Sequence, residues 1–166
     1  MELELKKLSL DGVAPALAKA ERYRLLNEPA EAESICLDIL DVDANNQQAM
    51  IALLLSLTDQ FGQNRTRLRK RAAEIVPRLN DEYERNYYSG LICERMGKAI
   101  IAKWNFGAVH DAYEWLHDAL EWYEKSEALR SDGNDEVVLR WNHCLRTMRE
   151  HNLQPRPKDE HPGFLE

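Results

Sequence analysis

The chain of 166 residues is 44% hydrophobic and 31% charged, a balance that provides one globular domain with its own core and argues against a mainly disordered chain. Its seven Gly and six Pro are few for this length, which disfavours a loop-rich, all-β fold. The 29 acidic and 22 basic residues give a net charge of −7, which disfavours a dedicated binder of nucleic acid or of anionic membranes.

The cysteines and the hydropathy of the sequence indicate the cellular compartment in which the protein is expected. Cys36, Cys93 and Cys144 are odd in number, widely separated and form no CxxC pair, so we expect buried free thiols in a reducing compartment. The opening residues MELELKKLSL lack an apolar signal-peptide core, and the longest apolar run, which begins at Met50, is too short to cross a bilayer. These features predict a cytoplasmic protein.

The hydrophobic pattern predicts helices from the start of the chain. The first begins at Asp11, a favourable N-cap, and has Pro15 in its first turn. The second opens at Pro29 and carries apolar residues at i, i+3, i+4, i+7 and i+8. We expect the first four helices over residues 11–27, from 29 to the polar cluster at 43–46, over 47–61 and over 64–78.

Three further helices follow. Asp81 and Glu84 have the spacing of a capping box and start the fifth helix, which ends either at Gly97 or near Trp104. The sixth and seventh helices are predicted over residues 108–129 and 135–152. The last segment contains three prolines, so we expect a flexible tail over residues 153–166. Residues 1–12, before the helical domain, are expected to form a leader.

An internal repeat relates these helices. Ala16, Ala20 and Tyr23 recur 34 residues later as Met50, Leu54 and Leu57, on the same face of the next odd-numbered helix. A helix–turn–helix period of 34 residues is typical of tetratricopeptide repeats.

The residues on this period resemble the tetratricopeptide repeat (TPR) family. In the first unit, Ala20 and Tyr23 match the family's helix A, and small and large apolar residues match its helix B. The second unit matches less well, with Leu54 at a small-residue position. The third recovers the small residues, and Ala119 lies about 19 residues later than two undisturbed units would place it. The matching positions outside the first helix A are Ala32, Cys36, Ile39, Gly90, Gly97, Ala119, Tyr123 and Ser126.

The resemblance implies an all-α, right-handed α-solenoid of about three units plus a capping helix, over residues 13–152. Its third unit would be enlarged by an insertion at about residues 98–114. Family members use a concave groove, lined by helix A of each unit, to hold peptide segments of other proteins. The resemblance therefore implies a non-enzymatic protein–protein interaction module (an adaptor, assembly factor or co-chaperone-like protein) without a cofactor.

The groove positions carry over from the family pattern unit by unit. Arg24, Arg95 and Arg146 could together bind a carboxylate, because a guanidinium makes bidentate contacts, or they could be ordinary surface groups. The apolar positions are Leu17, Ile51, Leu55, Leu91 and Leu139. The polar and aromatic positions are Glu21, Arg24, Gln48, Thr58, Tyr87, Glu94, Arg95, His143 and Arg146.

A basic run in the fourth helix supports an alternative function, an RNA- or ribonucleoprotein-associated helical protein. The run contains Arg65, Arg67, Arg69, Lys70 and Arg71, but no aromatic residue interleaves it to stack on bases. The helix after residue 111 is strongly acidic, and it could pair with the basic helix within one chain or between two chains.

The insertion at 98–114 is too apolar for a free loop tip. Either it folds back over its own solenoid, or it forms a homodimer contact. The candidate contact residues are Ile100, Ile101, Trp104 and Phe106.

A metal-carboxylate helical-bundle enzyme is a third, disfavoured possibility. Glu114 and His117 form an E-x-x-H pair with His110 one turn earlier, but the second pair that a two-metal bundle requires is missing. Of the three cysteines only Cys144 has a neighbouring histidine, His143, and adjacent residues of a helix point apart, so no enzymatic activity is expected.

Overall fold

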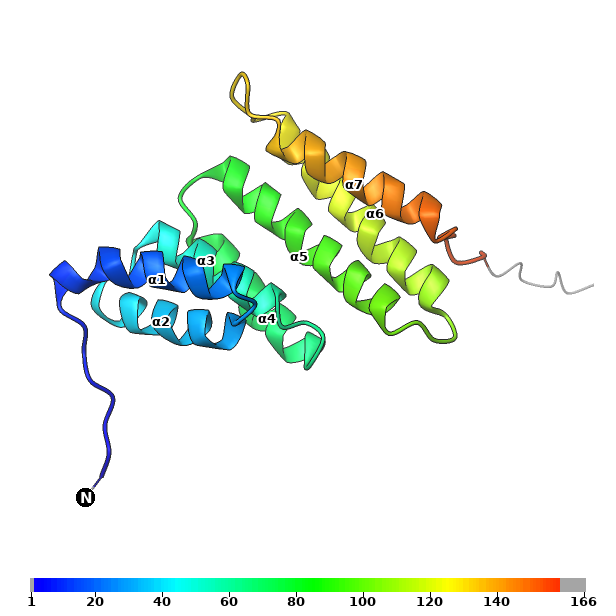
Figure 1. The fold of residues 1–166 in the computed structure, drawn as a ribbon. Coiled ribbons are helices and arrows are strands. Elements are labelled where there is room, and N and C mark those ends of the chain that lie inside the picture. Colours follow the sequence, from blue (N-terminus) through cyan, green and yellow to red (C-terminus); the bar gives the residue numbers. More distant parts are fainter. Residues whose placement is uncertain (1, 159–166) are drawn as a thin grey trace, which may run out of the picture.

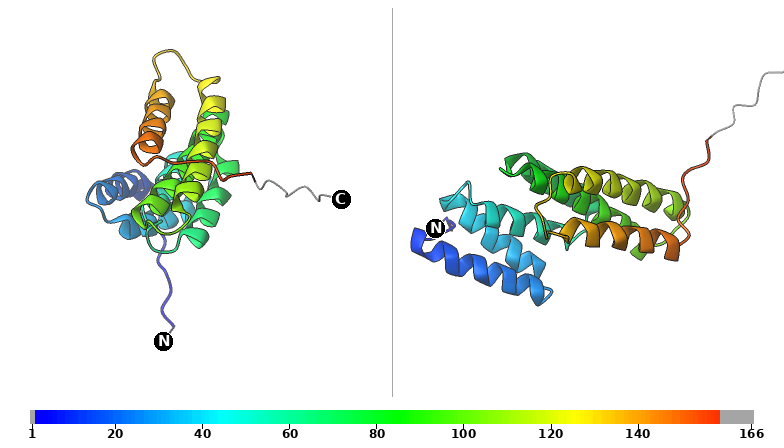
Figure 2. Two further views of the ribbon diagram at one scale, coloured as in Figure 1. Left: turned by 90° about the vertical axis from the view of Figure 1, so that its right-hand side faces the viewer. Right: turned by 90° about the horizontal axis from the view of Figure 1, so that it is seen from above.

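The computed structural model describes residues 2–158, which form an all-α protein with seven α-helices and no strand. Consecutive helices run antiparallel and pack side by side, as Figures 1 and 2 show. The helices are α1 (Val13–Leu25), α2 (Pro29–Val42), α3 (Gln47–Thr58), α4 (Arg65–Ile75), α5 (Glu82–Ala102), α6 (Ala108–Glu127) and α7 (Glu136–Glu150). None of these helices is long and apolar enough to cross a membrane.

Two hydrophobic cores divide the helices into two groups. The first core is built from α1 to α4 with Leu91, Ile92 and Met96 of α5, and the second from α5, α6 and α7 with Leu153. Figure 1 shows α1–α4 gathered on one side of α5, and α6 and α7 on the other. α5 therefore contributes to both cores, and α5 and α6 form the most extensive helix pair.

The helix ends follow local cap chemistry. Asn27, two residues after the end of α1, adopts a left-handed conformation with φ of 59°, and Pro29 occupies the first turn of α2. The Asn46 side chain accepts a hydrogen bond from the Ala49 amide at 2.9 Å, and the Asn64 side chain caps α4 in the same way. The helices start where these side chains satisfy free backbone donors.

The start of the first helix and the end of the third differ from the prediction, whereas the fifth helix starts at its predicted cap. A 3-10 turn (Leu10–Gly12) capped by the Ser9 hydroxyl precedes α1, so Asp11 lies inside this turn and is not the N-cap. α3 ends at Thr58, three residues before the predicted Phe61. The Asp81 carboxylate accepts a hydrogen bond from the Tyr83 amide, so it caps α5 without the Glu84 partner of a full capping box.

α5 does not end at Gly97 but continues to Ala102. A Cβ atom at Gly97 would lie 2.8 Å from Cγ of Leu116 on α6, so this glycine permits the close approach of the two helices. The insertion predicted at 98–114 therefore lengthens α5 and α6, and the short turn around Gly107, with φ of 88°, joins them.

The chain after α7 is partly packed where we expected a flexible tail. Leu153 is only 7% exposed and belongs to the second core. The Gln154 carbonyl hydrogen-bonds to His110 Nδ1 at 2.9 Å, and the Arg156 guanidinium pairs with Asp111 and Glu114 of α6. Figure 2 (left) shows this segment in red as it crosses the end of the α5/α6 hairpin. We call residues 153–156 the C-terminal segment; residues 159–166 lie outside the described part of the chain.

Candidate functional site: the odd-helix face

Several predicted groove residues of α1 and α3 surround one surface hollow. Glu21 and Arg24 come from α1, and Gln48, Ile51 and Leu55 come from α3. Together with Ala52 they enclose about 150 Å³. The helical spacing i, i+3 and i+4 places these residues on the face that each helix turns toward its odd-numbered neighbour.

Arg24 and Arg95 converge on a single carboxylate at the end of α3. Nε of Arg24 lies 2.9 Å from one carboxylate oxygen of Asp59, and Nη1 of Arg95 lies 3.1 Å from the other. The side chains of Arg24, Arg95 and Asp59 are 23%, 28% and 19% exposed, so solvent reaches all three. Arg24 and Arg95 therefore form salt bridges within the chain, as the alternative of ordinary surface groups expects, and their binding to a partner's carboxylate stays a prediction.

A second hollow continues from Arg95 along α5. Its volume is about 230 Å³, and Thr58, Phe61 and Ala99 contribute to its lining. Three basic side chains, Arg95, Lys98 and Lys103, also line it. Nζ of Lys103 donates a hydrogen bond to the Gly62 carbonyl, and Nζ of Lys98 lies 2.6 Å from a carboxylate oxygen of Glu94.

Glu94 is fully buried and joins α5, α6 and α7. The Tyr123 hydroxyl donates a hydrogen bond to Oε2 of Glu94 at 2.5 Å, while Lys98 and Arg140 approach Oε1 at 2.6 and 3.5 Å. Burial alone would raise the pKa of Glu94, but the hydrogen bonds from Lys98 and Tyr123 and the charges of Lys98 and Arg140 lower it below its ordinary value. The carboxylate is therefore ionised and internally neutralised.

Tyr87 is also a packing residue and is only 7% exposed. Its hydroxyl donates a hydrogen bond to Glu136 at 2.9 Å and accepts one from Nε of Arg140 at 3.3 Å. Burial raises the pKa of Tyr87 to about 12. Tyr87 and Glu94, which we expected to contact a partner, are thus used to hold α7 against α5.

The α7 positions lie beyond this network. His143 and Arg146 are exposed, and so is Leu139. The slight burial of His143, followed by the positive charge of Lys98, lowers its pKa; Arg140 and Arg146 act in the same direction and Glu94 opposes them. The remaining predicted position, Thr58, is buried, and its hydroxyl donates a hydrogen bond to the Leu55 carbonyl.

We call this surface of α1, α3, α5 and α7 the odd-helix face; among the charged side chains described above, six are basic and four are acidic. Sequence reasoning missed Asp59, Lys98, Lys103 and Arg140. Lys98 could have been found one turn after Glu94, and Arg140 one turn before His143. The basic residues of the face are Arg24, Arg95, Lys98, Lys103, Arg140 and Arg146, and its acidic residues are Glu21, Asp59, Glu94 and Glu136.

The basic run of α4 does not form one continuous surface. Arg71 pairs with Glu33 of α2 at 2.6 Å, and the Arg69 guanidinium lies 5.6 Å from the centre of the Trp115 ring. Arg65 is half-buried, so only Arg67 and Lys70 are exposed. Within residues 2–158 no ion pair joins α4 to the acidic α6.

The apolar residues of the insertion are divided between core and surface. Ile100 and Ile101 pack against the second core, and Trp104 is 52% exposed and stacks on His151. Phe106 is fully exposed at the tip of the hairpin. The homodimer stays a prediction, and the mass in solution of the wild-type and Trp104→Glu proteins would test it.

The E-x-x-H residues of α6 have other contacts. Glu114 pairs with Arg156, and His117 lies 3.6 Å from Glu121 and stacks on Tyr113. In residues 2–158 no group of three or more His, Cys, Asp or Glu side chains is placed to hold a metal ion.

No family model matches this chain, and no curated protein or solved structure is significantly similar to it.

Proposed function

We propose that this protein is a non-enzymatic, tetratricopeptide-like solenoid whose odd-helix face binds an acidic segment of another protein. The 34-residue repeat supports the solenoid, as do the small buried residues at its repeat positions, among them Ala20, Ala32 and Ala119. The three cysteines are free and buried, which fits a reducing compartment such as the cytoplasm.

The observation that carries the proposal is the convergence of Arg24 and Arg95 on Asp59. Two guanidiniums share one partly exposed carboxylate, and a hollow opens on each side of it. The two hollows contain apolar surface beside basic side chains, so they suit a peptide that alternates apolar and acidic residues. Asp59 occupies the position that a peptide carboxylate would take.

A binding experiment with the full chain tests this proposal. The probe is a short fluorescein-labelled peptide of alternating leucine and glutamate, with a leucine–glutamine peptide as its neutral counterpart. Because a charge-assisted hydrogen bond contributes about 1.5–3 kcal/mol, we expect Arg95→Gln to weaken binding of the acidic peptide about tenfold or more. Asp59→Asn should strengthen binding, because it removes the internal competitor.

Arg67→Gln is the matched control, because Arg67 is exposed on α4 and lies off the odd-helix face. It should leave the affinity unchanged, and circular dichroism would check that each variant is folded. If Arg95→Gln and Asp59→Asn both bound the acidic peptide like the wild type, the assigned face would be wrong.

No contact or surface described above specifically supports the alternative function, binding to nucleic acid. Arg69 and Arg71 are engaged with Trp115 and Glu33, which leaves two exposed basic side chains from the run of five. We therefore retain protein binding as the single proposed function.

A further inference from the structure

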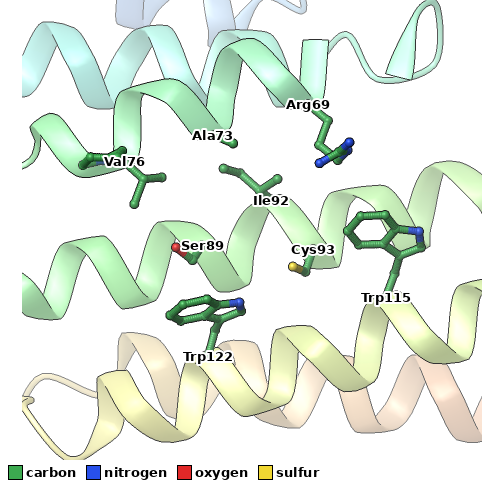
Figure 3. A pocket seen from close by; sticks show the side chains of 9 residues that line it. Arg69, Ala73, Val76, Ser89, Ile92, Cys93, Trp115 and Trp122 are labelled. Atoms are coloured by element: carbon green, nitrogen blue, oxygen red, sulfur yellow. The ribbon is translucent and has the colours of Figure 1, made fainter. Parts of the chain in front are cut away.

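Another groove lies between α4, α5 and α6, on the face of α5 opposite to Arg95 and Lys98. We call it the α4/α6 groove. Its volume is about 230 Å³, and its lining is mostly apolar. Figure 3 shows the rings of Trp115 and Trp122 on one side, with Ile92 and Cys93 of α5 between them and α4. Because the two tryptophans are seven residues apart on α6, their rings line the same side of the groove.

One guanidinium of α4, that of Arg69, lines this groove without an anionic partner in residues 2–158. Arg69 lines the groove and makes its contact with the Trp115 ring. Arg65 precedes it by one turn, and Nη1 of Arg65 is buried without a hydrogen-bond partner. A carboxylate that an occupant brings to this end of the groove would form a charge-assisted contact with the Arg69 guanidinium. The groove therefore suits apolar side chains flanked by acidic ones.

The path of the chain after α7 leads toward this groove. The C-terminal segment crosses the start of α6, where Arg156 pairs with Asp111 and Glu114. Asp111 and Glu114 lie one turn before Trp115 and Asp118 on the same face of α6. The described chain therefore ends beside the α6 face that carries the two tryptophans.

The residues that follow have the required length and chemistry. Residues 159–166 read DEHPGFLE, an apolar Phe164–Leu165 pair with acidic residues on both sides. Eight residues span up to about 26 Å when extended. Trp122 lies eleven residues after Asp111, a distance of about 16 Å along the helix. The whole groove is within reach.

We propose that residues 159–166 of this chain occupy the α4/α6 groove, with Phe164 and Leu165 against Trp115 and Trp122 and an acidic side chain beside Arg69. This contact joins α4 of the first helix group to α6 of the second.

The indole N–H signals of the full-length protein in ¹⁵N NMR spectra test this proposal. The Phe164→Ser/Leu165→Ser double variant should shift the signals of Trp115 and Trp122, assigned through Trp→Phe variants, and leave those of Trp104 and Trp141 in place. His161→Ser is the matched control, because it changes the same segment without removing apolar surface. A synthetic peptide of residues 157–166, added to the double variant, should restore the two wild-type signals.

Arg69→Gln, introduced into the double variant, should weaken binding of this peptide about tenfold, because it removes a charge-assisted contact. Unchanged Trp115 and Trp122 signals in the double variant would overturn the proposal. Signals that depend on protein concentration, together with a doubled mass, would overturn it in favour of the same segment from a second copy.

Discussion

Gly90 of α5 lies directly against the ring of Tyr123 on α6. A Cβ atom at Gly90 would lie 2.6 Å from two carbon atoms of this ring, far inside normal contact distance. The Tyr123 ring is fully buried and its hydroxyl is bonded to Glu94, so it cannot move aside without breaking that hydrogen bond. The absence of a side chain at Gly90 therefore sets the spacing of α5 and α6 and the position of the buried carboxylate.

Gly90→Ala should consequently destabilise the protein. Overpacking a core costs about 1–3 kcal/mol, and the tight contact places this variant at the upper end. The better helix propensity of alanine adds no more than about 1 kcal/mol to the free energy of unfolding. Urea unfolding monitored by circular dichroism measures the net loss.

Gly62→Ala is the control for this substitution, because a Cβ atom at Gly62 would meet nothing within 4 Å. Its stability should stay within about 0.5 kcal/mol of the wild type. A Gly90→Ala protein as stable as Gly62→Ala would contradict the close packing of α5 on Tyr123.

The Glu94 network predicts a pH-dependent part of the stability. The folded protein lowers the pKa of Glu94 below its ordinary value of 4.5, so the carboxylate stabilises the fold fully above that pH. As the pH falls below 4.5, the unfolded chain binds the proton first, and this stabilisation is lost as the pH falls through the folded pKa.

Glu94→Gln separates this contribution from that of the other acidic groups. At neutral pH the variant should lose about 2 kcal/mol, because the amide keeps the Tyr123 hydrogen bond but leaves Lys98 and Arg140 without a counter-charge. The difference between wild type and variant should shrink as the pH falls below 4.5. A constant difference between pH 7 and pH 3 would show that the Glu94 charge does not stabilise the fold.

The helices could be predicted from the sequence because their signals are local. Pro29 and the apolar period of α2 act within a few residues, and the structure confirms both. Gly97 was ambiguous because its small size serves a contact with Leu116, nineteen residues away, and not a helix end.

The candidate site was harder to predict, because its partners come from distant helices. The carboxylate that receives Arg24 and Arg95 is supplied by Asp59, which no pattern of the repeat marks. Repeat periodicity identifies the helix face on which Tyr87 lies. It does not tell whether the Tyr87 hydroxyl faces a ligand or, as in the structure, donates a hydrogen bond to Glu136. Only the crossing angle and spacing of the helices decide that difference.

The three thiols should be unreactive in the folded protein. Burial raises the pKa of Cys36 to about 11 and that of Cys93 to about 12, and it raises the pKa of Cys144 as well. At pH 8 only about 0.1% of a thiol with a pKa of 11 is thiolate, the reactive form.

Ellman's reagent at pH 8 should therefore modify none of the three thiols within minutes, and all three in denaturant. Cys93 lines the groove between α4, α5 and α6, so slow modification would begin there. Fast reaction of Cys36 or Cys144 in the native protein would contradict their burial.

Leu153 tests whether the C-terminal segment belongs to the folded domain. Its side chain is 7% exposed and packs in the second core, so Leu153→Ala removes buried apolar surface. Core Leu→Ala substitutions cost about 2–5 kcal/mol, and a site that lies outside the helices can relax, so we expect a loss of about 2 kcal/mol. Phe106→Ala is the control, because that ring is fully exposed and its removal should change the stability by less than about 0.5 kcal/mol. Equal stabilities of the two variants would mean that residues 153–156 are a tail in solution. A selective loss in Leu153→Ala would show that Leu153 packs in the second core in solution.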